Sequence, residues 1–177
     1  MNFAVEIVTR GVDYTRFRRV YNSEEFNREV AQAAKLKERS LLEHSKTADG
    51  KELKRVRITP SISLPGPVQK LFPEGQFSYE EITVLDPQSR TATYAIETSA
   101  GDKIQVVGLA RYMEEAGSVR LRFEGEANVK IFGVGSFVEK YLIGEVKARY
   151  ELVQRLLQAF IDEGRDTNLT PSIPVPR

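Results

Sequence analysis

The feature that most constrains this 177-residue chain is a long amphipathic segment near its end, residues 136–163. No proline interrupts it. Ser136 followed by Glu139 fits a capping box, and Gly164 is a typical residue just after a helix. At about 1.5 Å per residue this helix would be roughly 40 Å long, enough to cross a small domain. The segment therefore predicts one helix around which the rest of the chain is assembled.

The predicted helix has one broad apolar face and one polar face when residues are placed about 100° apart. The polar face carries Lys140, Lys147, Glu151, Gln154 and Gln158, and we expect it to face water. The apolar face carries Val138, Leu142, Val146, Leu152, Val153, Leu156, Leu157 and Phe160.

Two charged residues, Glu145 and Arg149, interrupt the apolar face one helical turn apart. Glutamate four residues before arginine is the favourable order for an ion pair, and a buried charge is costly unless it is paired. The first interpretation is a structural pair, or a stretch where the face is exposed. The alternative is a polar anchor for the head group of a ligand.

The composition narrows the class of protein. Lysine and arginine total 26 against 25 aspartate and glutamate, so no net field favours a nucleic acid as partner. No cysteine is present, which excludes disulfides and fits a reducing cytoplasm. No run approaches the roughly 20 apolar residues of an integral membrane segment, and the N-terminus lacks a signal-peptide pattern. We predict a cytoplasmic single domain over residues 1–163 and a flexible tail over 164–177.

Upstream of the long helix the hydrophobic pattern predicts mainly strands. Short turns rich in Asp, Gly and Pro separate them, so we expect an antiparallel meander, with Ala48-Asp49-Gly50 as the clearest hairpin turn. Ser23 is a predicted N-cap. Strand patterns cover 3–9, 37–46, 52–61, 76–85, 90–98, 103–113 and 118–131, and helical patterns cover 13–21 and about 23–36.

The strand pattern of residues 118–131 is the most regular. Apolar residues from Val119 to Ile131 alternate with polar ones, which predicts one buried face and one wet face. Gly125 and Ala127 leave room on the buried face, and either the helix or a cavity could fill it.

Two surface features have more than one interpretation. Residues 64–72 combine Pro and Gly with apolar side chains including Leu71 and Phe72, so they form either a lid over a groove or packing filler. Arg10, Arg16, Arg18 and Arg19 form a basic cluster, either a solvated face or a site of transient contact with an anionic membrane surface.

The order of elements resembles the helix-grip arrangement of the START-like (SRPBCC, birch-pollen-allergen-like) superfamily, and more closely an uncharacterised bacterial family within it. The resemblance implies an α+β fold, a curved antiparallel sheet of about seven strands wrapped around a long C-terminal helix with an apolar tunnel between them. Superfamily members bind sterols, phospholipids, polyketides or plant hormones, and some are cyclases or hydratases. The resemblance to this family lies in five stretches of the sequence, namely Arg57-Ile58-Thr59-Pro60, Leu64-Pro65, Val68-Gln69-Lys70-Leu71, residues 123–131 and residues 133–139.

Catalytic and cofactor motifs are sparse. His44 is the only histidine, so no histidine cluster for a metal exists, and we interpret it as structural or exposed. Glu80 and Glu81 are neighbours on a strand and point to opposite faces, which argues against an acid–base couple. Gly133 and Gly135 precede a helix but lack the third glycine of a dinucleotide motif. We predict no metal and no cofactor.

The sequence thus predicts binding or transfer of a lipid or other hydrophobic small molecule in the tunnel, with the head group at Arg149 or Glu145 and residues 64–72 as a gate. Phe77, Tyr79, Tyr94 and Tyr112 either pack in the core, which is the first interpretation, or line the tunnel with the tyrosine hydroxyls as polar groups. One alternative is a cyclase or hydratase type of enzyme, which a tight cluster of ionisable groups in the tunnel would favour. Another is a protein-interaction module whose pocket is filled by its own side chains, which an open tunnel would exclude. The predicted ligand-binding residues are Leu71, Phe72, Tyr94, Tyr112, Phe123, Leu142, Glu145, Val146, Arg149 and Val153.

Overall fold

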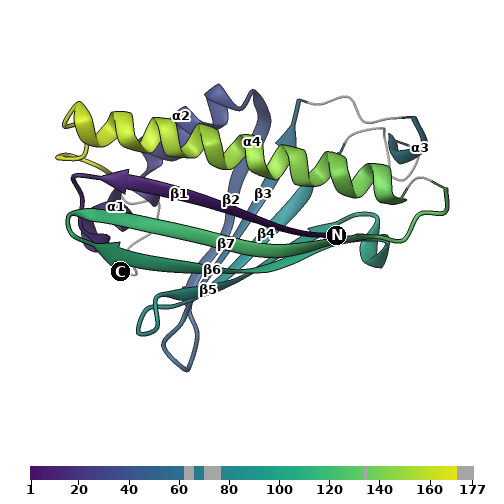
Figure 1. Ribbon diagram of the computed structural model, residues 1–177, viewed down its shortest axis with the longest axis horizontal. Helices are drawn as coiled ribbons and strands as arrows, with labels where there is room; N and C mark the ends of the chain where they lie inside the picture. The colour runs from purple at the N-terminus through teal and green to yellow at the C-terminus, as the bar shows by residue number, and fades with distance from the viewer. Residues whose placement is uncertain (62–65, 70–76, 134, 171–177) are drawn as a thin grey trace.

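A seven-stranded antiparallel sheet curves around one long helix (Figure 1). The computed structural model describes residues 1–61, 66–69, 77–133 and 135–170. The strands lie in the order β1-β7-β6-β5-β4-β3-β2, so the last strand of the meander, β7, pairs with the first strand of the chain, β1. The elements are β1 (Asn2–Arg10), α1 (Tyr14–Tyr21), α2 (Glu24–Ala33), β2 (Leu36–Lys46), β3 (Glu52–Pro60), α3 (Gly66–Gln69), β4 (Tyr79–Asp86), β5 (Thr91–Thr98), η2 (Gly101–Lys103), β6 (Ile104–Glu115), β7 (Ser118–Val129) and α4 (Gly135–Asp162).

The long helix is confirmed as α4, but the predicted capping box is wrong. The helix begins at Gly135, so Ser136 lies in its first turn, and the Glu139 carboxylate instead accepts a hydrogen bond from the Val129 backbone N–H at 3.0 Å. At the other end Gly164 has φ +66°, and the N–H of Arg165 bonds to the carbonyl of Phe160. This pattern is a Schellman ending, as expected for a glycine at that position.

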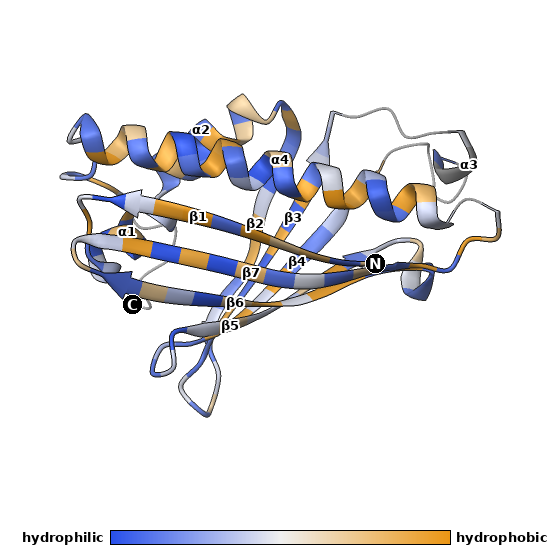
Figure 2. Cartoon of the chain, in the orientation of Figure 1, coloured by the Kyte–Doolittle hydropathy of each residue, from blue (hydrophilic) through white to orange (hydrophobic). Residues whose placement is uncertain are grey.

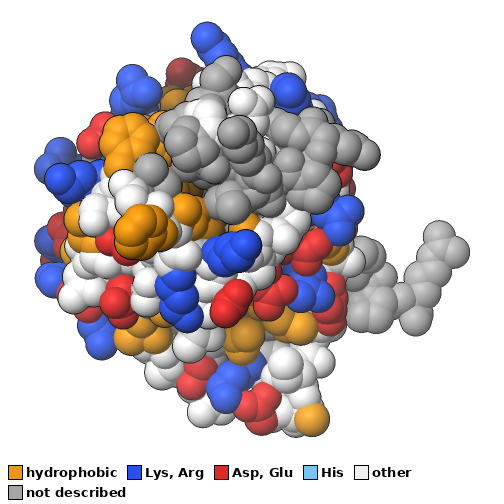
Figure 3. All heavy atoms as spheres, turned by 90° about the vertical axis from the view of Figure 1, so that its right-hand side faces the viewer, with side chains coloured by type: hydrophobic (Ala, Val, Ile, Leu, Met, Phe, Trp, Pro, Cys, Tyr) orange, Lys and Arg blue, Asp and Glu red, His pale blue; other side chains and the backbone are white. Residues whose placement is uncertain are grey.

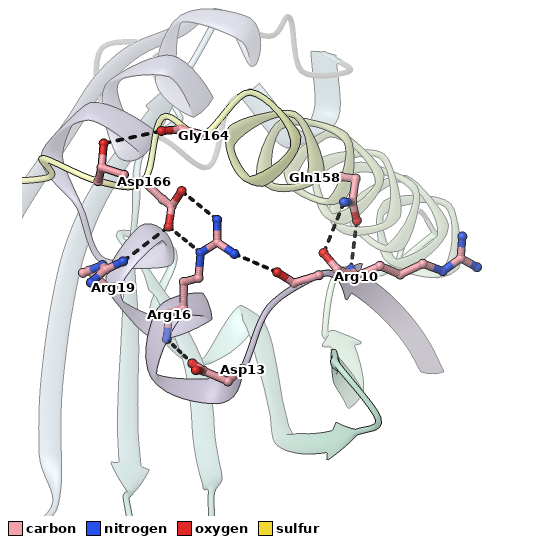
Figure 4. A network of polar contacts seen from close by, with 9 residues as sticks. Arg10, Asp13, Arg16, Arg19, Gln158, Gly164 and Asp166 are labelled. Carbon is pink, nitrogen blue, oxygen red and sulfur yellow. Dashed lines mark hydrogen bonds and ion pairs between the residues drawn. The ribbon is translucent and has the colours of Figure 1, made fainter.

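The two faces of α4 differ from the prediction at Gln154 and Gln158. Gln158 accepts a hydrogen bond from the Arg10 backbone N–H at 2.9 Å and donates to the Arg10 carbonyl at 3.3 Å (Figure 4). Gln154 accepts from the N–H of Val8 at 3.3 Å. These glutamines therefore bond to Val8 and Arg10 on the edge of β1, beside which no further strand lies in the described part of the chain, rather than face bulk water.

The buried face of α4 packs on the sheet and on α2. Val138, Val153, Leu157 and Phe160 of the predicted apolar face are buried, and the Phe160 ring meets Phe26 edge-on. Figure 2 shows this alternation of apolar and polar residues along α4 and along β7. Asp13 and Ser23 are the N-caps that precede α1 and α2, and their side chains accept hydrogen bonds from the N–H groups of Arg16 and Phe26.

The room that Gly125 leaves on β7 is filled by neither the helix nor a cavity. Phe3 is paired with Gly125 across β1 and β7, and a Cβ added to Gly125 would lie 2.8 Å from the Phe3 ring. The Phe3 ring in turn packs edge-on against Phe123. An aromatic ring from the neighbouring strand thus covers the glycine.

The residues after α4 make specific contacts where a flexible tail is predicted from 164 onward. The buried carboxylate of Asp166 pairs with the guanidinium of Arg16, whose Nη2 donates at 2.8 Å, and with Arg19 Nη2 at 3.3 Å (Figure 4). The N–H of Glu24 donates to the carbonyl of Thr170 at 2.9 Å. Residues 165–170 are therefore packed against α1 and α2, and Arg16 and Arg19 of the predicted basic cluster form ion pairs with Asp166.

The end of the molecule where α4 begins exposes aromatic side chains. Phe132 and Phe137 are exposed large hydrophobic residues in the β7–α4 connection and the first turn of α4. Figure 3 views this end and shows hydrophobic side chains gathered on it.

Candidate functional site

Two adjoining cavities lie between the inner face of the sheet and α4. We name them the polar cavity, of about 120 Å³, and the apolar cavity, of about 50 Å³. Both are lined by Glu81, Tyr94, Arg149 and Tyr150, so these four side chains form the wall between them. These two cavities, formed by described residues, differ in the chemistry of their lining.

The polar cavity is lined by ionisable groups from seven elements. Arg18 and Tyr21 come from α1, Arg39 and His44 from β2, Glu52 and Lys54 from β3, Glu81 from β4, Tyr94 from β5, Tyr112 from β6, and Arg149 and Tyr150 from α4. Apolar side chains complete it, namely Val56, Leu85, Ala110, Leu121 and Val153. It therefore offers both charge and an apolar surface to an occupant.

Two of its four cations are paired with carboxylates. Arg18 Nη2 lies 2.8 Å from Glu52 Oε2, and its guanidinium lies over the Tyr112 ring at 5.7 Å. Arg149 Nη1 lies 3.5 Å from Glu81 Oε1, and its guanidinium lies over the Tyr79 ring at 5.7 Å. These contacts stabilise a charged guanidinium that is largely out of water.

The other two cations, Arg39 and Lys54, have no carboxylate within ion-pairing distance in the described part of the chain. Lys54 Nζ donates to the side-chain oxygen of Asn22 at 3.2 Å. Burial lowers the pKa of the Lys54 ammonium to about 8, with Arg39 and Arg18 acting in the same direction. Burial also lowers the pKa of Arg39. Both groups carry charge at neutral pH in surroundings that oppose it.

His44 lines the same cavity with a side chain that is 5 % exposed. Its pKa is lowered by burial and by Lys54, so the imidazole is neutral at pH 7. Its Nδ1 is buried and has no hydrogen-bond partner among the residues that the structure describes. Its Nε2 is 3.9 Å from Glu52 Oε2, beyond hydrogen-bonding distance.

The apolar cavity lies nearer the start of α4. Its lining is mainly aliphatic and aromatic and includes Phe77, Tyr79, Ile96, Ile104, Val106, Leu142 and Val146. Glu81, Glu145 and Arg149 are its charged members. Burial raises the pKa of Tyr79, Tyr94 and Tyr150, so these phenols remain neutral donors.

Most of the predicted ligand-binding residues surround these cavities. Tyr94 and Arg149 line both, Tyr112 and Val153 line the polar one, and Leu142, Glu145 and Val146 line the apolar one. Phe123 is fully buried behind the lining, where its ring stacks on Tyr150 and meets Tyr94 edge-on. Leu71 and Phe72, and most of the predicted gate 64–72, lie outside the described residues.

The predicted ion pair between Glu145 and Arg149 is corrected by the structure, since the carboxylate that pairs with Arg149 is Glu81 on β4. The inward side chain on the strand opposite α4 lies closer to the guanidinium than the residue one turn earlier on the helix. Sequence reasoning also missed Arg39, His44, Lys54 and Tyr150 as cavity residues.

The position of His44 depends on a β-bulge. The register of β2 on β3 shifts between Leu41 and Glu43, and beyond the shift His44 pairs with Lys54. A bulge changes which face each later residue occupies. No group of three His, Asp or Glu side chains that could hold a metal ion occurs among the residues the structure describes. Nor does any helix described here have the length and hydropathy needed to cross a membrane.

Comparison with solved structures defines the class of the fold. The protein TTHA0849 of Thermus thermophilus matches with a TM-score of 0.64 at 11 % identity, over 93 % of this chain and 99 % of that chain. A START superfamily protein from Mycobacterium smegmatis matches with a TM-score of 0.54 at 16 % identity, over 92 % and 97 %. The Zhui aromatase/cyclase from Streptomyces sp. R1128 matches with a TM-score of 0.55 at 12 % identity, over 92 % and 93 %. The chain has the START-like helix-grip fold, as the resemblance implied.

The sequence itself places the chain in a family. Residues 8–161 match the family described as "Protein of unknown function (DUF2505)", and the chain belongs to this family. No match to a curated protein is found.

Proposed function

We propose that the protein binds or carries a hydrophobic small molecule in the two cavities between the sheet and α4. The observation that carries the proposal is a pair of internal cavities with apolar surface and a few convergent polar groups, as is usual for small-molecule sites. The fold supports this general class of function, since the structures that share it include a protein whose name states an aromatase/cyclase activity.

The size of the cavities restricts how a ligand is held. Typical ligand sites have roughly 300–1,000 Å³, whereas the cavities here have about 120 and 50 Å³. A small acid or aromatic molecule fits within the polar cavity. A lipid-sized molecule requires the wall of Glu81, Tyr94, Arg149 and Tyr150 to open.

A second candidate function is acid–base catalysis on such a molecule. The observation that favours it is the cluster of ionisable groups in the polar cavity, in which neutral His44, Glu52 and Lys54 lie together. Groups with altered pKa values in a cavity are typical of catalytic sites.

Native mass spectrometry of the protein from its expression host, followed by solvent extraction, tests the binding function. We expect a bound apolar molecule, which also identifies the ligand class. Incubating the extracted molecule with a hundredth equivalent of protein separates the two candidates, because a carrier returns it unchanged and an enzyme changes its retention time or mass.

Fluorescence of the neutral dye N-phenyl-1-naphthylamine provides a test that does not depend on the host. Val146→Phe narrows the apolar cavity and should weaken dye binding, whereas Val107→Phe, on an exposed position of β6, should not. A protein that is empty after purification and does not bind the dye would overturn the proposed function.

A further inference from the structure

The side chains of Arg39 and Lys54 are brought to the same cavity by the pairing of β2 with β3. Arg39 is paired with Ile58, and Lys54 with His44. Directly paired residues of antiparallel strands lie on the same face of the sheet, and Lys54, Val56 and Ile58 alternate onto one face of β3. Since Val56 and Ile58 are buried, that face is the inner one. The register therefore turns two cations and a histidine inward.

The charges of the polar cavity do not balance. Its lining contains the cations Arg18, Arg39, Lys54 and Arg149 and the carboxylates Glu52 and Glu81. Glu52 pairs with Arg18 and Glu81 with Arg149, so Arg39 and Lys54 remain without an anionic partner among the described residues. Burying an unpaired charge is unfavourable, and replacing it by an apolar side chain usually stabilises a protein. Arg39 and Lys54 are each only partly exposed, and packing gives neither of them an anionic partner among the described residues.

His44 gives a second, independent indication of a ligand. Its side chain is 95 % buried, and its Nδ1 has no hydrogen-bond partner within the described part of the protein. Buried polar atoms nearly always have a partner. An occupant of the cavity that hydrogen-bonds to the imidazole would satisfy it.

Arg39 and Lys54 also lie between the cavity and the surface. Both line an open groove of about 410 Å³ between α2 and β2, together with Arg28 and Lys37. The groove carries four cations against Glu24 and Glu38, so its charge has the same sign as that of the cavity. An anion that follows this groove reaches the two side chains that have no partner inside.

We propose that Arg39, Lys54 and His44 form an anion subsite that binds a carboxylate or phosphate monoester group of the molecule held in the polar cavity. The proposal rests on the proposed binding function and specifies the class of its ligand. The guanidinium of Arg39 offers the planar fork that matches these oxyanions, and Lys54 supplies a compact charge. The neutral imidazole of His44 donates an N–H hydrogen bond to the same group.

Calorimetric titration at pH 7 with three probes that share a naphthalene ring tests the subsite. The probes are 2-naphthoate, 2-naphthyl phosphate and the neutral 2-naphthalenemethanol. A charge-assisted contact predicts that the better of the two anions binds about tenfold or more tightly than the alcohol. The ratio of the two anions distinguishes a carboxylate from a phosphate ligand.

The double variant Arg39→Met with Lys54→Met keeps the stems of both side chains and removes the charges. We expect it to lose the preference for the anions, to about twofold or less, while the alcohol still binds. The matched control, Lys140→Met with Arg155→Met, removes two exposed cations of α4 and should keep the preference. Circular dichroism verifies that both variants are folded, and Arg39→Gln with Lys54→Gln replaces the first variant if it is not.

The outcomes separate the two proposals. Equal affinity of the unmodified protein for the alcohol and the anions overturns the anion subsite and leaves the binding function standing. An anion preference that survives in the double variant also overturns the subsite. If neither the naphthalene probes nor N-phenyl-1-naphthylamine binds, both the anion subsite and the proposed binding function are overturned.

Discussion

Arg149 on α4 and Glu81 on β4 join the helix to the sheet, with 3.5 Å between Arg149 Nη1 and Glu81 Oε1. Both residues line both cavities, so the ion pair lies in the wall between them. Each side chain is 22 % exposed, which places the pair between a buried and a surface salt bridge. A molecule that spans the two cavities would contact this pair.

Removing the cation of this pair should destabilise the fold. Arg149→Met leaves the Glu81 carboxylate without its partner in a partly buried site, and we expect a loss of about 2 kcal/mol in the free energy of unfolding, below the range for fully buried pairs. Urea denaturation measures it. Adding Glu81→Gln to Arg149→Met should recover most of the loss.

The control for this prediction is Glu145→Gln, which removes the carboxylate one turn away on α4. Because Arg149 pairs with Glu81, this change should alter the free energy of unfolding by about 0.5 kcal/mol or less. A larger loss for Glu145→Gln than for Glu81→Gln would show that the pairing on the helix is the one that matters.

Lys54 should make the protein more stable at higher pH than at neutral pH. The pKa of Lys54 is lowered to about 8 in the folded protein by burial and by Arg39 and Arg18, against the smaller opposing effects of Glu81 and Glu52. Between about pH 8 and 10.4 the unfolded chain binds a proton at this lysine that the folded chain does not, so stability rises with pH across that range. Below pH 8 the penalty of charging the buried amine is complete.

The measurement is the difference in unfolding free energy between Lys54→Met and the unmodified protein at pH 7 and pH 10, which cancels most of the titration of the tyrosines. We expect the variant to be more stable at pH 7 by about 1–3 kcal/mol and the advantage to shrink at pH 10. His44 faces Lys54 but is neutral at both values, so it does not contribute to the difference. A variant less stable than the unmodified protein at pH 7 would assign Lys54 a structural role.

Asp166 should be sensitive to acid. The hydrogen bond from Arg16 holds the pKa of the Asp166 carboxyl at about 2, against burial, which opposes it. A lowered carboxylate pKa contributes stability that is complete above about pH 4 and is lost as the pH falls toward 2, here roughly 2 kcal/mol.

Thermal denaturation of Asp166→Asn measures this contribution. The variant should unfold at a lower temperature than the unmodified protein at pH 7, and the two should converge near pH 2. Asp102→Asn, at an exposed position of η2, is the control and should have no such effect. An unchanged melting temperature for Asp166→Asn at pH 7 would mean that the packing of residues 165–170 does not depend on this ion pair.

The regular patterns in the sequence predicted the elements because each pattern reflects one element and its own burial. The alternation of 118–131 predicted β7 and its buried face, and Gly164 predicted the end of α4, since φ +66° there favours glycine. Contacts between different elements were harder to predict from the sequence. The partner of Arg149 is on another strand, and Gln154 and Gln158 are polar residues that meet the backbone of β1 rather than water.

The polar cavity was harder to predict for a specific reason. Charged residues at alternate positions of a strand normally indicate the face toward solvent. On β3, however, the charged residues Glu52 and Lys54 line the cavity. His44 faces inward only because the register shift between Leu41 and Glu43 changes the alternation of β2. A single sequence carries no sign of that extra residue, because the pairing partner of each position sets the register.

The glycine that Phe3 covers provides the last test. A Cβ at Gly125 would lie 2.8 Å from the Phe3 ring and 2.9 Å from the Val107 carbonyl oxygen, so Gly125→Ala forces the backbone or the ring to move, at about 1–3 kcal/mol. Gly144 is the matched control, since nothing lies within 4 Å of its added Cβ and it is within α4, where alanine should stabilise by about 0.5–1 kcal/mol. Urea denaturation of both variants should therefore give changes of opposite sign. Tolerance of Gly125→Ala would mean that the Phe3 ring leaves this position readily, and that the space above β7 is available to a ligand.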